Sequence, residues 1–546
     1  MRGFLIFLLF FDVLAVPVSR AQPRGAEAPG PSQALFNNPF YSCLRNFYVA
    51  TTGNDANDGT SPSTPWATIQ KADTSSRTGG DCINVAPGTY QQNVLIQHGG
   101  NAPTSTGYVV YRCQTMNACH ILASGAGELF QLQYGGNFVV VDGFELDGNN
   151  ALQTDGITLT CISTGDSVPG NSSTQAGSGS HHIWVLNNII HHCNQSGVQL
   201  NGREWFYTIH NTVYHNSWTS GFNGSGISYY VVQCIEAGGT NCFTSAIAGQ
   251  PANAVNYTPS GDDTAPFNGL SAWSPFHNVV AWNIAYNNRV TRGSALSCNA
   301  HTDGNGIILD TFRDGFAYNL QYPYQTLVMN NVAYYNGGKG IHTFRGVNIT
   351  FANNSAFNNN TDTCMEQNGW VVGDLASIGS GNPPGDGSNN TWINNLSESV
   401  QGPFGWTASI PHGPNHCALT SWGAGDVNKV YTNNIFSTGE SGSPVAPEIH
   451  ACLGDNDVNY VSCTNNLCGT DPGFVNATPG TVGDVNGNPV GGTWIPGNHN
   501  LAITGASPAN NYVVSPAPSW LPAQNTDAGA CHHSLTTCPN PGTSNF

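Results

Sequence analysis

Three side chains that could carry out acid–base chemistry on a charged sugar lie close together in the middle of the chain. Lys339, one of three lysines in the protein, stands between glycines and is followed by His342 and Arg345. β-Elimination from a uronic acid needs a base for the proton next to the carboxylate, a cation against that carboxylate, and a proton donor for the leaving oxygen. A lysine whose pKa is lowered can be the base, and arginine binds carboxylates through paired N–H groups. We therefore predict Lys339 as the base, Arg345 and His342 as further catalytic residues, and an acidic polysaccharide as the substrate.

Carboxylates precede this group by one unit of the repeat described below. Asp303, Asp310 and Asp314 supply the hard oxygen ligands that calcium prefers. A calcium ion beside the substrate would neutralise its carboxylate and stabilise the enolate-like intermediate. The three aspartates are therefore predicted as ligands of Ca²⁺.

Further polar residues of the same stretch are predicted to contact the substrate. Asn305 stands directly before a glycine, as Lys339 does, so the two occupy equivalent positions in the repeat. His301 is a candidate acid for the leaving oxygen. We predict His301, Asn305 and Arg313 as substrate-binding residues.

Two other functions fit the same residues. Hydrolysis of a glycosidic bond needs two carboxyl groups about 5 to 10 Å apart, and Asp303, Asp310 or Asp314 could supply them. A third possibility is a non-catalytic carbohydrate-binding or cell-surface protein. The chain has aromatic side chains that could stack on sugar rings, although core packing is the commoner role; they are Trp205, Tyr207, Tyr229, Tyr230, Trp273 and Trp282.

The elements that must position these residues follow a repeat built around asparagines. Asn188 and Asn211 are 23 residues apart, as are Asn331 and Asn354, and each lies between two short apolar runs. A fixed period of roughly 20 to 50 residues indicates stacked repeat units, and asparagine at each turn can bond the backbone and its stacked neighbours. Similar positions recur at wider spacings, at Asn283, Asn395, Asn434 and Asn466. The pattern predicts an all-β fold, a right-handed parallel β-helix with an asparagine ladder; a β-sandwich with asparagine-rich turns is the alternative.

Several segments interrupt the repeat and are predicted as long loop insertions. They cover residues 235–274, 373–388 and 403–427. In a repeat fold such insertions commonly lie on one side and border a binding groove. One short helix is predicted over residues 65–72, where Trp66, Ile69 and Ala72 fall on one face. It would cover the open end of the first coil.

Composition and charge narrow the class of partner. The chain has 546 residues, of which 39% are hydrophobic and 8% charged, and its formal net charge is −18. Nucleic acids are excluded as expected partners, because phosphate binding needs a surplus of Lys and Arg. The protein is expected to be a monomer with an acidic polysaccharide as its partner.

The ends of the chain indicate export. Residues 1–21 have a basic start, an apolar run and small residues at a cleavage position, as a secretory signal peptide does. No later apolar stretch is long enough to span a membrane. We predict a signal peptide at 1–21, a linker at 22–45, a β-helix domain at 46–530 and a tail at 531–546. The mature protein is expected to be secreted, with the periplasm as the other possible location.

Sixteen cysteines are consistent with an oxidising compartment. Their sequence spacing favours disulfides that close short loops, with metal binding by thiolates as the minor alternative. The close pairs predicted to bond are Cys113/Cys119, Cys234/Cys242, Cys463/Cys468 and Cys531/Cys538.

The N-terminal region resembles the entry segment of secreted right-handed β-helix proteins, including family 9 pectate lyases and related polysaccharide lyases. The shared residues are YVATTGNDANDGT at 48–60, PWATIQKA at 65–72 and GDCINVAPGTY at 80–90. The segments TDPGFVN and GASPA, at 470–476 and 505–509, resemble the closing segment of the same proteins. The resemblance implies a β-helix, a lysine base at Lys339, and a calcium held by aspartates that include Asp303.

Overall fold

The computed structural model describes most of the central region of the chain. By its internal contacts the chain divides into Met1–Asn37 and Asn38–Phe546, and all described residues belong to the second unit. The described residues are 40–133, 135–149, 159–164, 180–218, 224–232, 276–290, 301–312, 321–362, 373–381, 385–398, 417–423, 425–437, 465–468, 474–477, 499–503, 506–512 and 528–530. Among them, no helix is long and apolar enough to cross a membrane.

Three parallel sheets make up nearly all of the described structure. Sheet A contains β1 (Arg45–Val49), β2 (Asp81–Val85), β5 (Val109–Cys113), β8 (Val139–Asp142), β11 (Ile183–Leu186), β14 (Phe206–Ile209), β17 (Phe276–Ala281), β20 (Gln325–Met329), β23 (Ile349–Ala352), β26 (Thr391–Ile393) and β29 (Val430–Thr432). Sheet B contains β3 (Gly88–Gln91), β6 (Cys119–Leu122), β9 (Phe144–Asp147), β12 (Ile189–His191), β15 (Thr212–Tyr214), β18 (Ile284–Tyr286), β21 (Val332–Tyr334), β24 (Ser355–Phe357), β27 (Leu396–Glu398), β30 (Ile435–Ser437) and β31 (Leu467–Cys468). Sheet C contains β4 (Val94–Ile96), β7 (Phe130–Leu132), β10 (Ile162–Ser163), β13 (Val198–Asn201), β16 (Ser225–Tyr230), β19 (Asn305–Asp310), β22 (Ile341–Phe344), β25 (Gly373–Ile378) and β28 (Cys417–Trp422).

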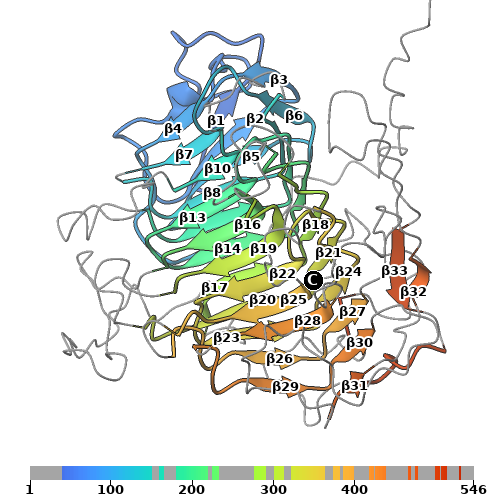
Figure 1. Cartoon of the computed structure of the whole chain (residues 1–546). Coiled ribbons are helices and arrows are strands. Elements are labelled where there is room, and N and C mark those ends of the chain that lie inside the picture. The colour runs from blue at the N-terminus through green and yellow to red at the C-terminus, as the bar shows by residue number, and fades with distance from the viewer. Residues whose placement is uncertain are drawn as a thin grey trace, which may run out of the picture. The chain divides into compact units, whose positions relative to one another are not determined.

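The strand order confirms the predicted parallel β-helix. Within each sheet, neighbouring strands are parallel and one turn of the coil apart, as the strand arrows of Figure 1 show. Successive strands of the chain pass from sheet to sheet, so the backbone winds as a right-handed coil. A sandwich would be built from antiparallel strands. The only antiparallel pair among the described residues is β32 (Phe474–Ala477) with β33 (His499–Ile503).

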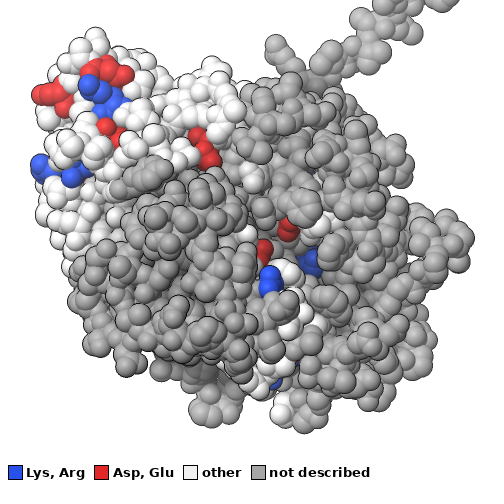
Figure 2. All heavy atoms as spheres, turned by 60° about the vertical axis from the view of Figure 1, so that its left-hand side comes forward, with Lys and Arg blue, Asp and Glu red and all other residues white. Residues whose placement is uncertain are grey.

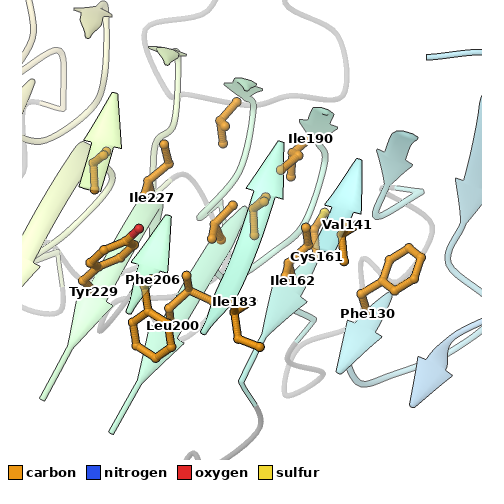
Figure 3. Close-up of a cluster of buried hydrophobic side chains, with 14 of the residues drawn as sticks. Phe130, Val141, Cys161, Ile162, Ile183, Ile190, Leu200, Phe206, Ile227 and Tyr229 are labelled. Carbon is orange, nitrogen blue, oxygen red and sulfur yellow. The ribbon is translucent and has the colours of Figure 1, made fainter. Parts of the chain in front are cut away.

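The core runs along the inside of the coil. Ile162, Leu200 and Ile227 of sheet C are fully buried, and Figure 3 shows their side chains between the sheets, with Phe206 and Ile183 of sheet A nearby. Each such side chain contributes about 1.5–3 kcal/mol when it is removed from water. On the face that Figure 2 shows, most of the described residues are neither acidic nor basic, and Lys, Arg, Asp and Glu form small groups.

The predicted asparagine ladder is present at the bend between sheets A and B. Each side-chain amide donates from Nδ2 to the Oδ1 of the asparagine one coil further on, at 2.8 to 3.1 Å. The ladder runs through Asn188, Asn211, Asn283, Asn331, Asn354, Asn395, Asn434 and Asn466. The residue before each ladder asparagine has a positive φ, for example 55° at Asn330 and 51° at Asn353. Asparagine tolerates that conformation better than most residues, which explains the frequent Asn-Asn pairs.

A second ladder was not predicted. It lies just after sheet B and joins Asn216, Asn288, Asn336 and Asn359 by Nδ2 to Oδ1 bonds of 2.8 to 3.1 Å. Its last described bond runs from Asn359 to the carboxylate of Asp374, at 2.6 Å. The spacing of 23 residues between Asn336 and Asn359 was a signal in the sequence that could have revealed it.

The predicted helix over residues 65–72 is wrong: only a 3-10 turn, η1 (Gln70–Ala72), forms there. Trp66 instead pairs with β1, because its N–H donates to Tyr48 and its carbonyl accepts from Ala50, both at 2.9 Å. The carboxylate of Asp55 accepts the backbone N–H groups of Ala67 and Thr68, so these two residues are held by the preceding loop. Trp66, Ile69 and Ala72 are nevertheless buried in the core.

Two of the predicted insertions contain strands of the coil. Residues 373–378 form β25 and residues 417–422 form β28, both in sheet C, so their assignment to insertions is corrected. Leu375 and Leu419 continue the buried column of Ile341. The repeat was hidden because Asp374 replaces the glycine that precedes this column in the four coils before it, at Gly197, Gly226, Gly306 and Gly340. Residues 235–274 lie outside the described part of the chain.

Three disulfides tie the described coils together. Cys113–Cys119 confirms one predicted pair. Cys43–Cys82 and Cys161–Cys193, with sequence separations of 39 and 32, were not predicted. The other predicted pairs involve residues outside the described part of the chain. Phe40 and Tyr41 are buried near Cys43, so the segment just before β1 packs on the coil.

Candidate active site

The candidate site lies on the outer face of sheet C. In β22, Ile341 and Thr343 point inward, because the first lies in the core and the second donates to Leu309. His342 between them therefore points outward, directly beside Ile308 of β19, which in turn lies beside Ser228 of β16. All three residues are nevertheless buried. This face is therefore shielded from solvent despite its outward direction.

Lys339 lies just before β22 and is 5% exposed. Within the described structure its amine forms no ion pair or hydrogen bond. Burial lowers the pKa of Lys339 to about 8, because it disfavours the charged form; the nearby carboxylate of Asp303 acts in the opposite direction. A lysine with such a pKa is partly unprotonated near neutral pH and can accept a proton.

His342 follows Lys339 by three residues and lies within its electrostatic influence. It is 3% exposed, and neither ring nitrogen has a hydrogen-bond partner within the described structure. Its pKa is lowered well below the usual value, first by burial and then by the charge of Lys339. The imidazole is therefore neutral. A buried polar group without a partner costs about 1–3 kcal/mol. The two ring nitrogens of His342, within the electrostatic influence of the buried Lys339, therefore make this a candidate functional site.

Asn305 and Asp303 lie on the preceding coil, at the start of β19, and contribute to the site. The amide of Asn305 donates to the Oγ of Ser225 at 3.1 Å and to Asp303 at 3.0 Å. Its oxygen accepts the backbone N–H of Lys339 at 3.0 Å. A Cβ on Gly338 would lie 2.5 Å from that oxygen, so only glycine permits this approach. Asn305 therefore positions Lys339 and has no donor left for a substrate.

A histidine–carboxylate pair lies at the same edge of the sheet. The Nδ1 of His301 lies 2.5 Å from the carboxylate of Asp362, and both residues are buried. The backbone N–H of Asp362 donates to the carbonyl of Gly337, two residues before Lys339, at 3.0 Å. A carboxylate that orients an imidazole is a common arrangement in acid–base sites. Asp362 was missed by the sequence analysis, because nothing in its local pattern links it to His301.

The structure does not bring Arg345 to Lys339. Arg345 follows β22 at the opposite end from Lys339, and Ile341–Phe344 alone spans about 10 Å. Its Nε donates to the buried carboxylate of Asp386 at 2.8 Å. The predicted grouping is therefore corrected: Lys339 and His342 lie together, and Arg345 lies elsewhere.

The predicted calcium ligands are separated in the same way. Asp303 precedes β19 and Asp310 ends it, so the length of a strand lies between their carboxylates. Calcium needs six to eight oxygen ligands at 2.3–2.6 Å. Asp303 is the one predicted ligand beside Lys339 in the described structure, which does not by itself fit a calcium site. Asp314 and Arg313 lie outside the described residues.

A comparison with protein families finds a match in the region that carries the sequence resemblance. Residues 51–97 match a family described as Protein of unknown function (DUF1565). A search of curated proteins finds no match.

Several solved structures are similar in fold at low identity. Pectate lyase Pel9A is 15% identical, with a TM-score of 0.43, 91% of this chain covered and 98% of that chain. The GH136 lacto-N-biosidase from Eubacterium ramulus is 12% identical, with a TM-score of 0.38 and coverages of 78% and 68%. The alginate lyase from Paenibacillus sp. str. FPU-7 is 13% identical, with a TM-score of 0.37 and coverages of 71% and 95%. The fold assignment itself rests on the strand order of the three sheets, which is that of a right-handed parallel β-helix.

Proposed function

We propose that this chain is a secreted enzyme that cleaves an acidic polysaccharide by β-elimination, with Lys339 as the base. One observation carries the proposal: the buried Lys339 forms no ion pair or side-chain hydrogen bond with the described residues, and its charge lowers the pKa of the buried His342, whose ring nitrogens have no described partner. A lysine kept for stability would be paired, as Lys429 is with Asp426 at 2.7 Å.

The proposed reaction transfers one proton to Lys339. Its unprotonated amine takes the proton on the carbon next to the uronic acid carboxylate, and the electron pair left behind forms an enolate-like intermediate. The bond from the β-carbon to the glycosidic oxygen then breaks, a carbon–carbon double bond forms, and the leaving oxygen takes a proton. His301, oriented by Asp362, is the proposed donor of that proton, and the new ammonium of Lys339 stabilises the carboxylate side.

The other predicted roles change with the geometry. Asn305 becomes a positioning residue for Lys339, and His342 remains a candidate hydrogen-bond donor to the substrate. Arg345 is no longer the proposed carboxylate-binding residue because Asp386 occupies it. Calcium, the monomeric state and secretion remain predictions.

The experiment is an assay for unsaturated uronide product, followed by its ultraviolet absorbance. Pectate, alginate, chondroitin and a heparin-like polymer are tested with the full chain, with calcium and with a chelator. Lys339→Met preserves the buried volume and removes the base, while Lys71→Met, at an exposed lysine, is the matched control. We expect product with one polymer class and a loss of at least about 100-fold in Lys339→Met alone.

Other outcomes distinguish the alternatives. Equal activity in wild type and Lys339→Met would contradict the role of the base. Release of reducing sugar without unsaturated product would indicate a hydrolase, for which Asp303 and Asp362 at one edge are the candidate carboxyl groups. Binding of a polymer without any product would favour the non-catalytic protein.

A further inference from the structure

A second group of chemically active side chains lies on sheet B and has no part in the proposed reaction. Asp147 ends β9 and lies directly opposite His191, which ends β12; His192 follows at the bend. The Oδ1 of Asp147 lies 3.6 Å from the Nδ1 of His191 and 3.9 Å from the Nδ1 of His192. The two Nδ1 atoms are 2.6 Å apart. Three potential ligand atoms of different residues therefore converge on one point.

The hydrogen bonds around the group determine which ring nitrogen of His191 faces that point. The Nε2 of His191 lies 3.2 Å from the carboxylate of Glu145, so it carries the hydrogen and donates it. The Nδ1 of His191 is then left with a lone pair directed at the Nδ1 of His192. Two lone pairs cannot face each other at this distance, so either His192 carries its hydrogen on Nδ1 and donates it to His191, or a metal ion binds both nitrogens.

The surroundings favour a metal ion. Histidines that bind metals usually donate their other N–H to a carboxylate, as His191 does to Glu145. Ligating carboxylates are themselves hydrogen-bonded, as Asp147 is by the Nε2 of His120 at 3.2 Å. The ring of Tyr214 stacks on His191 with centroids 4.9 Å apart and holds its orientation. The ligands and the residues that orient them thus come from four successive coils and the bend.

The group is also accessible from solvent. The side chain of His191 is 6% exposed, whereas Asp147 is 19% and His192 28% exposed. An ion can therefore enter on the side of Asp147 and His192, and a water or a ligand oxygen can complete its coordination. Two imidazoles and one carboxylate suit zinc and other first-row transition metals, whereas calcium prefers oxygen ligands alone.

We propose that Asp147, His191 and His192 bind one divalent first-row transition metal ion, with Glu145 and His120 orienting the ligands. The site lies on a different sheet from Lys339, so this proposal does not depend on the proposed lyase activity. Three protein ligands leave at least one coordination position for water or a ligand oxygen.

The experiment measures zinc binding by the full chain after treatment with a chelator. Calorimetric titration with Zn²⁺ gives stoichiometry and affinity, and the visible spectrum with Co²⁺ reports the ligand field. His192→Asn removes one ligand and keeps a residue that tolerates the positive φ of 58° at this bend. Asp147→Asn removes the carboxylate. His98→Asn is the matched control, because His98 forms a single histidine–carboxylate pair with Asp73.

We expect one zinc ion bound by the wild type and by His98→Asn, and at least about 100-fold weaker binding in His192→Asn and Asp147→Asn. Glu145→Gln should weaken binding by about 10- to 100-fold, the usual effect of residues that orient a ligand. Equal affinity in wild type and Asp147→Asn, or no binding by the wild type, would overturn the proposal. Circular dichroism shows which variants fold. If His192→Asn fails to fold, the Co²⁺ spectra of wild type and Asp147→Asn decide, because identical spectra would exclude Asp147 as a ligand.

Discussion

The asparagine ladders and the Lys339 site differ in how their buried polar side chains are hydrogen-bonded. In the ladders each side-chain amide forms a hydrogen bond to the next coil. Asn331, for example, donates to Val280 and Asn354 and accepts from Asn283. At the outer face of sheet C, the ring nitrogens of His342 have no such partner in the described structure. The ladder amides stabilise the coil because each is hydrogen-bonded within it. The ring nitrogens of His342 contribute no such bond among the described residues, so His342 is a candidate for binding a substrate.

The two buried lysines sharpen the same contrast. Lys429 bonds Ser421 and Asp426, whereas Lys339 has only the more distant influence of Asp303. Burial raises the pKa of Asp426 to about 6 even with Lys429 beside it, so this pair is strongly desolvated. Lys429 is thus part of the scaffold, and Lys339 is part of the candidate site.

The largest expected effect separates these lysines. Lys339→Met should reduce lyase turnover by about 10²- to 10⁴-fold, the usual contribution of a general base, with little loss of stability. Lys429→Met should leave turnover per folded molecule nearly unchanged but lower the unfolding free energy by about 3–5 kcal/mol, because it leaves Asp426 buried and unpaired. Turnover and denaturant unfolding are measured for both variants. The reverse pattern would contradict the division between scaffold and site.

The next effect is a dependence on pH. Because Lys339 must be unprotonated to act, turnover should rise as the pH increases through about 8. The unfolded chain holds the lysine proton up to about pH 10.4, so between these values the unfolded state binds more protons than the folded state. Stability from this group therefore increases with pH over that window, by about 3 kcal/mol in total. The measurement is the difference in unfolding free energy between wild type and Lys339→Met at pH 7.5, just below the window, and at pH 10, near its upper end. A difference that does not change with pH would contradict the lowered pKa.

A third prediction concerns the ladder. Asn331→Ala should lower the unfolding free energy by about 2–3 kcal/mol, because it removes the acceptor of two hydrogen bonds from Asn283, one from its backbone N–H and one from Nδ2, and the donor to the carbonyl of Val280. Asn101→Ala, at an exposed asparagine, is the control and should change stability by less than about 0.5 kcal/mol. Thermal or denaturant unfolding measures both. Equal losses would show that the ladder contributes no more than an exposed amide.

The smallest expected effect is on stability at His342. His342→Phe removes two buried nitrogens that lack described partners, so the unfolding free energy should change by less than about 1 kcal/mol or increase. Turnover should nevertheless decrease, because the candidate substrate donor is lost. Unfolding and lyase assays on the same preparation test both statements. A large loss of stability would show that His342 serves the scaffold.

The repeat could be predicted because its signals are local. Asparagine at a fixed spacing, glycine before an apolar residue and short alternating runs all follow from the bend and strand that each residue occupies. The same alignment put Lys339 and Asn305 in equivalent positions, and the structure joins them by a hydrogen bond. Where the local signal changed, as at Asp374, the strand was missed.

The composition of the site could not be predicted from local signals. Asp362 meets His301 across 61 residues, and Asp386 meets Arg345 across 41. Asp303 and Asp310 lie close in sequence, but an extended strand keeps them apart. Proximity in a coil depends on loop lengths between strands, and these vary from one turn to the next.

The amino-acid sequence by itself therefore determined the coil, its asparagine ladder and the presence of a rare lysine in a glycine-bounded bend, because each depends on residues a few positions apart. Only the tertiary structure decided that Lys339 is buried beside His342, that Arg345 is engaged elsewhere, and that Asp147, His191 and His192 converge on sheet B. The reason is physical: burial and charge are set by neighbours one coil away, and the chain reaches those neighbours only after a complete turn.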